Sequence, residues 1–473
     1  MTIGMLAAMS TPRPAPAAPA ARPVVPQAAP AAPDAAPAGP ADVAPRGAQE
    51  AVRGRQDACP GTLRLHAADD GALARVRIPG GVLDVRRARA LADAAARLGD
   101  GDLHLTSRGN VQLRGLRDGC GGELAAALDA AGLLPSPAHE RVRNVVASPL
   151  SGLDGQGSRD VRPWLTALDA LLCGSAPARD LSGRFLFALD DGRGDVAGLG
   201  ADVVVQALEG AHARLLLGPR RESLRVPAEH APEAALTAAH TFLDLARDTE
   251  GRTWRISDLA LPDGELRNAV AGRLAAAGIP ARRDAEPARE PHAEGAAARG
   301  PRPGRVGDAL CVHVPFGRLT ALQWDVLIRL AAAHAGELRL TPWRGVVVPV
   351  PGIGAADADD ALARCAAAGL VTGDSPWLRV GACVGRPGCA KSRADVRADA
   401  GRMLPAVVAS PLPLYWSGCA RRCGAPRGDR VDVVAAPEGG YRVTRAGDDG
   451  QDARATPLRT PGDLAAALRV AAP

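Results

Sequence analysis

Four cysteines lie in two close pairs toward the C-terminal end of the chain. Cys383 and Cys389 belong to the stretch GACVGRPGCAKS, and Cys419 and Cys423 belong to LYWSGCARRCGAP. The spacings are Cys-x5-Cys and Cys-x3-Cys, separated by about thirty residues. A thiolate is a soft ligand that prefers zinc, copper or iron–sulfur groups. The two pairs therefore predict a metal centre.

The spacing and the neighbouring glycines favour one kind of centre. Structural zinc sites commonly use two Cys-x2–4-Cys pairs, and the first pair here falls outside that range. Cubane iron–sulfur clusters are held by four thiolates, and glycine-rich backbone around them offers N–H donors to the sulfurs. We therefore favour an iron–sulfur cluster, with zinc or unrelated buried cysteines as the alternatives. Five further cysteines are scattered singly and are expected to be small core residues: Cys59, Cys120, Cys173, Cys311 and Cys365.

Length and composition exclude several classes of protein. The chain has 473 residues, of which 47% are hydrophobic, so two or more folded cores are expected. Its formal charge is only +5, and the arginines alternate with acidic residues, which argues against a nucleic-acid partner. No apolar run is long enough for a membrane span. The first residues lack the basic segment of a secretory signal, so we expect a cytoplasmic protein with reduced thiols.

Low-complexity segments divide the chain, and a repeat relates its halves. Residues 1–55 are rich in Ala and Pro and are predicted to be disordered, and residues 285–308 are predicted to be a linker. Residues 76–107 and 312–342 share one pattern: an alternating strand, a Pro-x-Gly turn, an amphipathic helix and a strand that ends in Leu-Thr. The chain therefore looks like a fused duplication, whose interface is a natural place for a ligand.

The repeat continues into the segments that follow. Residues 201–218 and 430–447 both read as two strands joined by a Gly-containing turn. RVRNVVASPLSG (141–152) occupies the position that LRVGACVGRPGC (378–389) holds in the second half, but it contains no cysteine. One metal centre, not two, is therefore predicted.

The cysteine pairs, the duplicated halves and LHLTSRGNVQLRGL (103–116) together resemble the nitrite and sulfite reductase superfamily. That resemblance implies an α+β fold in which two ferredoxin-like half-domains and two α/β domains are related by pseudo-twofold symmetry. The implied boundaries are 56–135 for the first half-domain, 136–284 for an α/β domain without a cluster, 309–370 for the second half-domain and 371–473 for the cluster-binding α/β domain.

Within the superfamily, VRIPGG, CVHVPFGRLT and YWSGCARRC are most similar to the precorrin-3B synthases. This similarity implies a [4Fe-4S] cluster held by Cys383, Cys389, Cys419 and Cys423, and an oxygen-dependent monooxygenase of aerobic cobalamin biosynthesis that hydroxylates precorrin-3A and closes a lactone. In the reductases the position of Cys423 bridges to sirohaem iron. A sirohaem-dependent ferredoxin nitrite or sulfite reductase is the alternative function.

Two departures from the reductase pattern disfavour that alternative. LSGRFLFALD (181–190) has Arg184 and Leu186 where the reductases have two lysines that hold the anionic substrate. A leucine side chain can donate neither a hydrogen bond nor a proton. GCARRC also differs from the Gly-Cys-Pro-Asn-Gly-Cys that is common in the reductases.

The arginines of the family motifs suit a substrate with many carboxylates, because a guanidinium binds a carboxylate through two parallel hydrogen bonds. Gln112 and Asn144 could add neutral hydrogen bonds, and Arg344 is a weaker candidate from the second half. The residues that match basic positions of the family's tetrapyrrole cavity, and that we predict to bind substrate, are Arg108, Arg114, Arg143 and Arg184.

The implied reaction also requires O2 and an external electron donor, linked to NADH or to ferredoxin. A mononuclear non-haem iron is a candidate second cofactor, although no two-His-one-carboxylate set is evident. His104 and His313 are expected to be core or surface residues and not iron ligands. A third hypothesis is a non-catalytic zinc or iron–sulfur scaffold that binds a partner protein.

Overall fold

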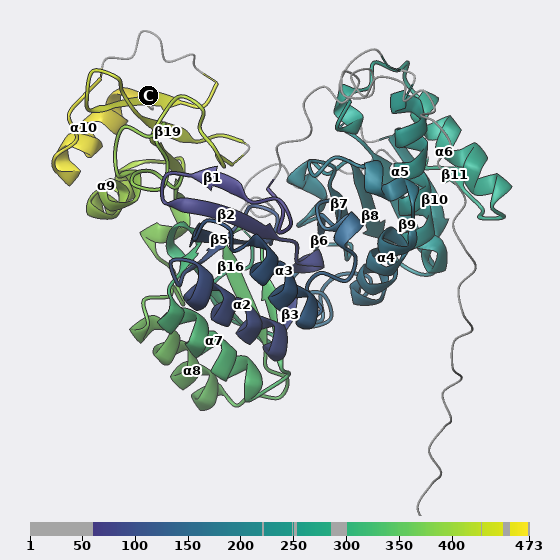
Figure 1. The fold of residues 1–473 in the computed structure, drawn as a ribbon, viewed down its shortest axis with the longest axis horizontal. Helices are drawn as coiled ribbons and strands as arrows, with labels where there is room; N and C mark the ends of the chain where they lie inside the picture. The colour runs from purple at the N-terminus through teal and green to yellow at the C-terminus, as the bar shows by residue number, and fades with distance from the viewer. Residues whose placement is uncertain are drawn as a thin grey trace, which may run out of the picture. The chain divides into compact units, whose positions relative to one another are not determined.

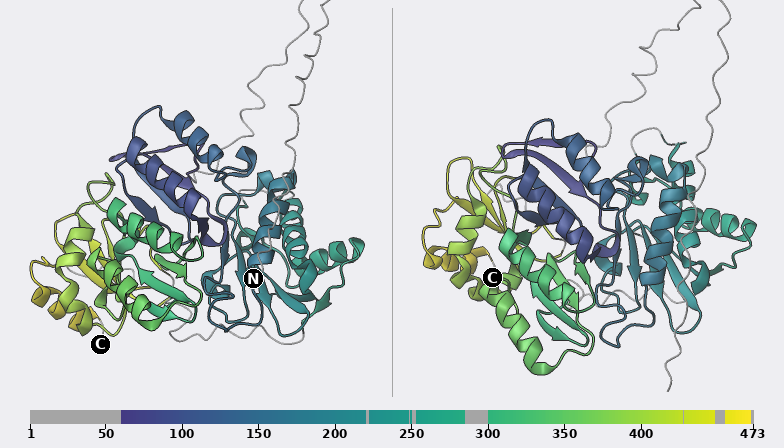
Figure 2. Two further views of the ribbon diagram at one scale, coloured as in Figure 1. Left: turned by 90° about the horizontal axis from the view of Figure 1, so that it is seen from below. Right: turned by 60° about the horizontal axis from the view of Figure 1, so that its bottom comes forward.

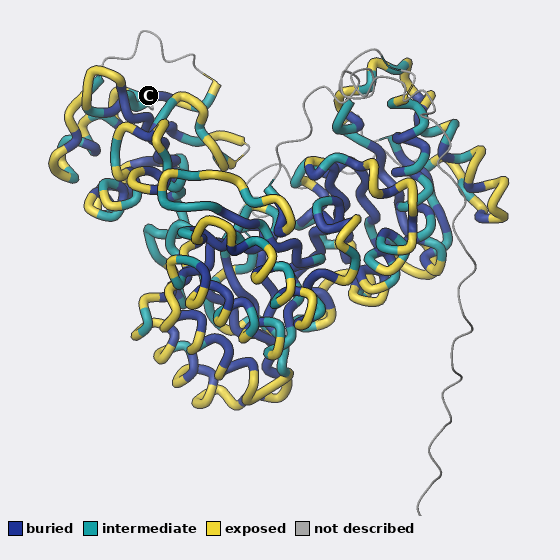
Figure 3. Tube along the Cα trace, in the orientation of Figure 1, coloured by how far each residue is buried: buried dark blue, intermediate teal, exposed yellow. Residues whose placement is uncertain are grey.

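The computed structural model describes residues 60–219, 222–247, 249, 253–284, 300–426, 428–447 and 455–471. The predicted tail (1–55) lies outside the described residues, as do residues 285–299 of the predicted linker. Four β-sheets with helices packed against them form the described part of the chain (Figure 1). The central strands of the sheets are buried while the outer faces of the helices are exposed, which Figure 3 shows as dark blue and yellow stretches of the tube.

Two sheets of similar topology form the ferredoxin-like halves. The first has the strand order β1-β2-β5-β4-β14, and the second has the order β12-β13-β16-β15-β3. The strands are β1 (His66–Ala68), β2 (Gly71–Val76), β3 (Val82–Asp84), β4 (Leu103–Leu105), β5 (Val111–Leu116), β12 (Gly304–Val306), β13 (Ala309–His313), β14 (Arg318–Leu319), β15 (Glu337–Leu340) and β16 (Gly345–Pro349). Their helices are α2 (Val85–Leu98), α3 (Gly121–Ala130), α7 (Ala321–Ala332) and α8 (Ala355–Ala367).

The two halves exchange one strand each. After its Pro-x-Gly turn, β3 of the first half pairs with β15 of the second, and β14 of the second half pairs with β4 of the first. Gly81 and Gly317, which end these turns, have positive φ angles of 72° and 69°, a region that glycine adopts without steric cost. The helices α2 and α7 pack side by side (Figures 1 and 2), and Trp324 Nε1 donates to the Ala88 carbonyl over 2.9 Å. The halves therefore share one hydrophobic core.

The other two sheets are mixed and also match each other. One has β6 (Val145–Ala147), β7 (Phe187–Asp190) and β8 (Val203–Ala207) in parallel, followed by antiparallel β9 (His212–Leu217), β10 (Glu222–Pro227) and β11 (Arg282–Arg283). The second has β17 (Val380–Ala382), β18 (Leu414–Ser417) and β19 (Val431–Ala435) in parallel, followed by antiparallel β20 (Tyr441–Arg445). Their helices are α4 (Arg162–Gly174), α5 (Ala231–Arg247), α6 (Glu265–Ala276), α9 (Val396–Arg402) and α10 (Pro461–Ala471).

One element lies where the sequence predicted a linker. Residues 304–306 form β12 and pair with β13, so the second half-domain begins inside the stretch 285–308. A three-residue edge strand among Gly, Pro and Arg is too short to show the alternation of apolar and polar residues by which a strand is recognised in a sequence. Its hydrogen bonds to β13 hold it in the extended conformation. Within the described residues, no helix is both long enough and apolar enough to cross a membrane.

Candidate metal centre

The two cysteine pairs follow the ends of neighbouring parallel strands. Cys383 directly follows β17, and Cys419 follows β18 after one intervening residue, Gly418. Ligand sites in sheets with parallel strands lie outside the carboxyl ends of those strands. The Gly418 N–H donates to Cys383 Sγ over 3.3 Å, so the backbone already directs a hydrogen bond at one of the sulfurs.

The other three thiols all lie within electrostatic reach of Cys423. Burial raises the pKa of Cys423, and the neighbouring thiolates of Cys419, Cys383 and Cys389 raise it further, while Arg421 lowers it. A bound cation would reverse this repulsion, because coordination favours the thiolate. The structure therefore brings together the four residues that the sequence predicted to bind a metal.

The distances between the sulfur atoms indicate whether a single metal ion or a larger cluster would fit. One tetrahedral zinc ion with Zn–S bonds of about 2.3 Å needs sulfurs roughly 3.8 Å apart. In the described part of the chain, the one group of three metal-ligating residues whose donor atoms all lie within 4.8 Å is Asp190, Asp191 and Asp195, and it contains no cysteine. The four thiols are thus more widely spaced than a single ion requires. Four thiols around a larger volume fit the donor set of a [4Fe-4S] cluster.

A turn from the first half supports the first cysteine loop. Asp70, in the turn between β1 and β2, accepts two hydrogen bonds from Arg114, from Nε at 2.9 Å and Nη2 at 2.8 Å. Arg114 Nη2 also donates to the Gly388 carbonyl over 2.8 Å, and the neighbouring Asp69 accepts from the Ala390 N–H. Arg114, predicted to bind substrate, therefore lies next to Cys389 but is already paired with a carboxylate.

The other side of the thiols is cationic. Arg397 Nε donates to the Cys383 carbonyl over 3.2 Å. Burial, together with the nearby Arg344, Arg318 and Arg114, lowers the pKa of Arg397 to about 10, while Cys383 raises it. Sequence reasoning missed Arg397, because an arginine early in a surface helix of an arginine-rich chain carries no distinguishing signal.

The remaining predicted substrate residues fall into two groups. Arg108 donates to the carbonyls of Gly183 and Arg184 over 3.1 and 2.9 Å, and the Arg184 guanidinium lies over the Trp254 ring at 3.9 Å. Asn144 joins the same network by donating to Gly183 over 2.9 Å.

Arg143 lies apart from that network. It is buried, and it binds both oxygens of Asp169 over 2.7 Å. Arg108, Arg184 and Asn144 thus come together around Gly183. Arg143 and Arg114 each form an ion pair elsewhere.

His104 is buried and His313 is half-buried, and burial favours the neutral form of both side chains. Burial lowers the pKa of His313 to about 4, and Arg344 lowers it further. Burial also lowers the pKa of His104, although Asp100, 3.7 Å from its Nε2, opposes that shift. Neither belongs to a group of metal-ligating residues in the described residues.

The first half has an acidic network where the second half has its cysteines. Asp190 at the end of β7 accepts from the N–H groups of Gly192, Gly194, Val196 and Ala197. Ser148, directly after β6, donates to Asp195 over 2.6 Å. These contacts are made within the loops themselves, so the equivalent position is filled by protein groups.

Asp195 makes this network sensitive to pH. Burial and the neighbouring Asp190 and Asp191 raise the pKa of Asp195 from 3.8 to about 7. Between these values the folded chain keeps a proton that the unfolded chain has released, so stability falls as the pH rises through that window. Between about pH 5 and about pH 8 this loss is about 3 kcal/mol, and we expect Asp195→Asn to remove most of it.

The measurement is urea unfolding of wild type and Asp195→Asn at about pH 5 and about pH 8. The wild-type midpoint should fall between the two values of pH more than that of the variant. The exposed Asp360→Asn provides the control, and its pH profile should match that of wild type. Equal pH profiles for wild type and Asp195→Asn would show that Asp195 is ionised throughout.

The fold of the described residues is similar to that of the nitrite and sulfite reductases. The family model described as the nitrite/sulfite reductase ferredoxin-like half domain matches residues 66–131 and 302–368. The structure of the Mycobacterium tuberculosis NirA protein superposes with a TM-score of 0.64 at 22% identity, over 84% of this chain and 79% of that one. The predicted fold class, with its two ferredoxin-like half-domains, is therefore confirmed.

Relatives with two different activities resemble this chain. A precorrin-3B synthase from Sinorhizobium sp is 28% identical over 393 residues, 80% of this chain and 81% of the relative. A ferredoxin–nitrite reductase from Synechococcus elongatus is 27% identical over 411 residues, 77% of this chain and 76% of the relative. Both kinds of relative are oxidoreductases, and the resemblance inferred from the motifs is confirmed.

Proposed function

We propose that this protein is a monooxygenase of the precorrin-3B synthase type that uses O2 to hydroxylate precorrin-3A, with lactone formation, in aerobic cobalamin biosynthesis. The main support for this proposal is the apolar environment of Leu186. Leu186 is only 4% exposed and belongs to an apolar cluster with Val146, Ala188 and Val204. Under the motif alignment it replaces a lysine of the reductases, and this side chain can give an anion neither charge nor a proton.

The thiols and their neighbours suit a [4Fe-4S] cluster bound by Cys383, Cys389, Cys419 and Cys423. When bound, such a group supplies single-electron transfer. Arg114 and Asp70 would hold the Cys389 loop in position, and the Gly418 N–H would donate to the Cys383 sulfur. A second, mononuclear iron finds no histidine–carboxylate group among the described residues, and we do not include it.

Arg108 and Arg184 are the best placed of the four predicted substrate arginines. The Arg184 side chain is exposed and stacked on Trp254, so its guanidinium is accessible to a carboxylate of the substrate. Arg114 and Arg143 would first have to leave Asp70 and Asp169. The proposed role of the Arg108–Arg184 network is to bind acetate and propionate groups on the rim of the tetrapyrrole.

The test of the function combines cofactor analysis with turnover. Protein purified without oxygen should show iron and sulfide near four per chain and a broad cluster absorbance without sirohaem bands. Incubation with precorrin-3A, a reductant and labelled O2 should add one labelled oxygen atom to the product, detected by mass spectrometry. Sirohaem bands with reduction of nitrite or sulfite would instead establish the reductase function.

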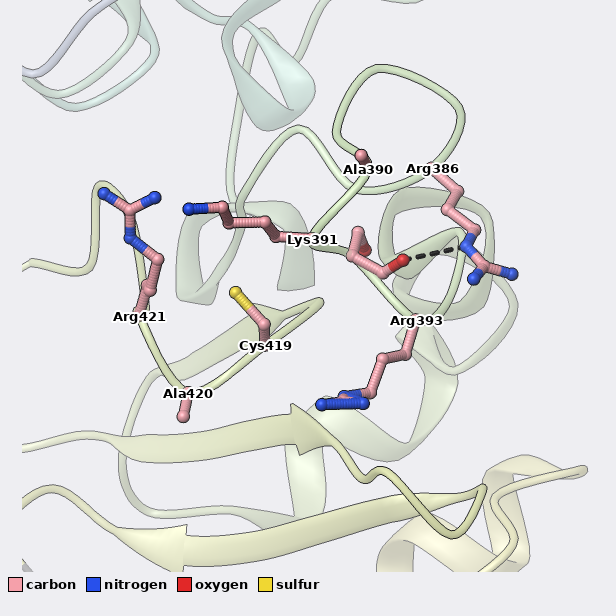
Figure 4. Close-up of a pocket in the computed structure, with 8 residues that line it drawn as sticks. Arg386, Ala390, Lys391, Arg393, Cys419, Ala420 and Arg421 are labelled. Carbon is pink, nitrogen blue, oxygen red and sulfur yellow. Dashed lines mark hydrogen bonds between the residues drawn. The ribbon is translucent and has the colours of Figure 1, made fainter. Parts of the chain in front are cut away.

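A basic pocket beside Cys419 suits the external electron donor. Its volume is about 480 Å³, and Figure 4 shows Arg386, Lys391, Arg393 and Arg421 around Cys419. None of these four cations has a carboxylate within 4.0 Å in the described part of the chain. We propose that an acidic one-electron donor, such as a ferredoxin, docks on this pocket by charge complementarity.

Reversing two of these charges should slow electron delivery. We expect Lys391→Glu combined with Arg421→Glu to lower the rate of reduction by a ferredoxin at least tenfold at low ionic strength, with a weaker dependence on salt. Stopped-flow absorbance would measure the rate. Reduction by dithionite should be unchanged, and Arg364→Glu on α8, outside the pocket, is the matched control. An unaltered ferredoxin rate would place donor docking elsewhere.

A further inference from the structure

The turn between β15 and β16 contains an arginine in a conformation that normally favours glycine. Arg344 has a φ of 61°, and Gly109 has a φ of 66° in the equivalent turn of the first half. Both turns are closed alike, by Thr341 N–H to the Gly345 carbonyl and by Thr106 N–H to the Asn110 carbonyl, each over 2.9 Å. The repeat therefore aligns Arg344 with Gly109 and not with Arg108. A left-handed conformation costs an arginine roughly 1 kcal/mol or more.

The Arg344 side chain reaches the second cysteine pair. Its Nη2 donates to the Gly424 carbonyl, the residue after Cys423, over 3.4 Å. The buried Tyr415 hydroxyl, which donates to the Cys423 carbonyl, lies beside the same guanidinium. Both side chains thus contact the segment that carries Cys423.

Two glycines, Gly317 and Gly381, leave the space that the Arg344 side chain needs to reach the Cys423 segment. A Cβ atom on Gly317 would lie 2.8 Å from Arg344 Cδ, which is too close for any larger residue unless the arginine moved. A Cβ atom on Gly381 would lie 2.9 Å from the Tyr415 ring and 3.5 Å from Arg344 Nη1. The space that these glycines leave is therefore occupied by the arginine and the tyrosine.

The charge of Arg344 has no acidic partner. No carboxylate of the described residues lies within 4.0 Å of Arg344 or of Arg397, whereas Arg114, Arg318 and Arg422 each form an ion pair. A cubane with a doubly positive core and four thiolates is a dianion, and one-electron reduction adds another negative charge. Two uncompensated guanidinium groups beside Cys383 and Cys423 would stabilise that added charge.

We propose that Arg344 is a positioning residue that fixes the Cys423 segment and holds a positive charge there, which raises the reduction potential of the cluster. The inference rests on the proposed cluster but not on the proposed reaction. A glycine at this position would relieve the backbone strain, but it could not supply the positive charge.

The test is a reductive titration with dithionite, followed by electron paramagnetic resonance, on wild type, Arg344→Gly, Arg344→Lys and the control Arg364→Gln. Arg344→Gly restores the residue of the first half and should fold at least as well. At a fixed potential its ratio of reduced to oxidised cluster should fall about tenfold, equivalent to 59 mV for one electron. Arg344→Lys should stay closer to wild type, because the charge is kept.

The possible results distinguish a failure of the proposed role of Arg344 from a failure of the proposed cofactor. A lower potential in Arg344→Gly alone, or loss of cluster from Arg344→Gly but not from Arg344→Lys, supports the role. Unchanged potentials in Arg344→Gly with full iron content overturn the role while leaving the cluster and the reaction intact. A wild-type protein without any iron–sulfur cluster would overturn the proposed cofactor and this inference together.

Discussion

Cys419→Ser is expected to abolish cluster binding and turnover. Cys419 follows β18 and faces the basic pocket, so its loss removes one of the four proposed ligands at the point where both cysteine loops meet. A serine hydroxyl does not ionise near neutral pH and is a poor ligand for iron in thiolate surroundings. Iron should fall from about four per chain to near zero, and the cluster absorbance should disappear with it.

Cys173→Ser is the matched control, because Cys173 is a half-buried cysteine on α4, in the domain without the predicted cluster. It should keep full iron content and activity. Iron and sulfide assays with circular dichroism would separate loss of cluster from loss of fold. Full activity in Cys419→Ser would remove this residue from the site, whereas zinc in place of iron in the wild type would favour the scaffold hypothesis.

Arg143→Ala is expected to destabilise the protein by about 3 kcal/mol, because it leaves the partly buried Asp169 without its partner. The Arg143 side chain is 7% exposed and its guanidinium binds both carboxylate oxygens over 2.7 Å, so this interaction is the structural role of Arg143. Cluster absorbance should not change. Urea unfolding would measure the loss, with the transition of this domain followed separately if unfolding is not two-state.

The double variant Arg143→Ala/Asp169→Ala separates this role from substrate binding. It removes both charges and should recover much of the stability. If tetrapyrrole affinity is weakened equally in the single and double variants, Arg143 also binds substrate, as the sequence predicted. If affinity returns with stability, its role is the ion pair alone.

Local patterns were sufficient to predict most of the architecture. The shared strand, turn and helix pattern of residues 76–107 and 312–342 predicted the duplication, because alternation and helical periodicity are set over a few neighbouring residues. The pattern did not predict that β3 and β14 cross to the opposite sheets. A two- or three-residue strand has no periodicity of its own, and its partner is chosen by the packing of the other half.

In the candidate site, too, some features follow from the sequence and others depend on the tertiary structure. The thiol chemistry of Cys383, Cys389, Cys419 and Cys423 follows from residue type and spacing, so the sequence alone is sufficient to predict a metal centre in one half. Only the tertiary structure decided which charges face it. Arg114 forms an ion pair with Asp70, which lies 44 positions away in the sequence, and Arg143 forms one with Asp169. Arg344 and Arg397 have no such partner, because the fold brings no carboxylate of the described residues within 4.0 Å of either guanidinium.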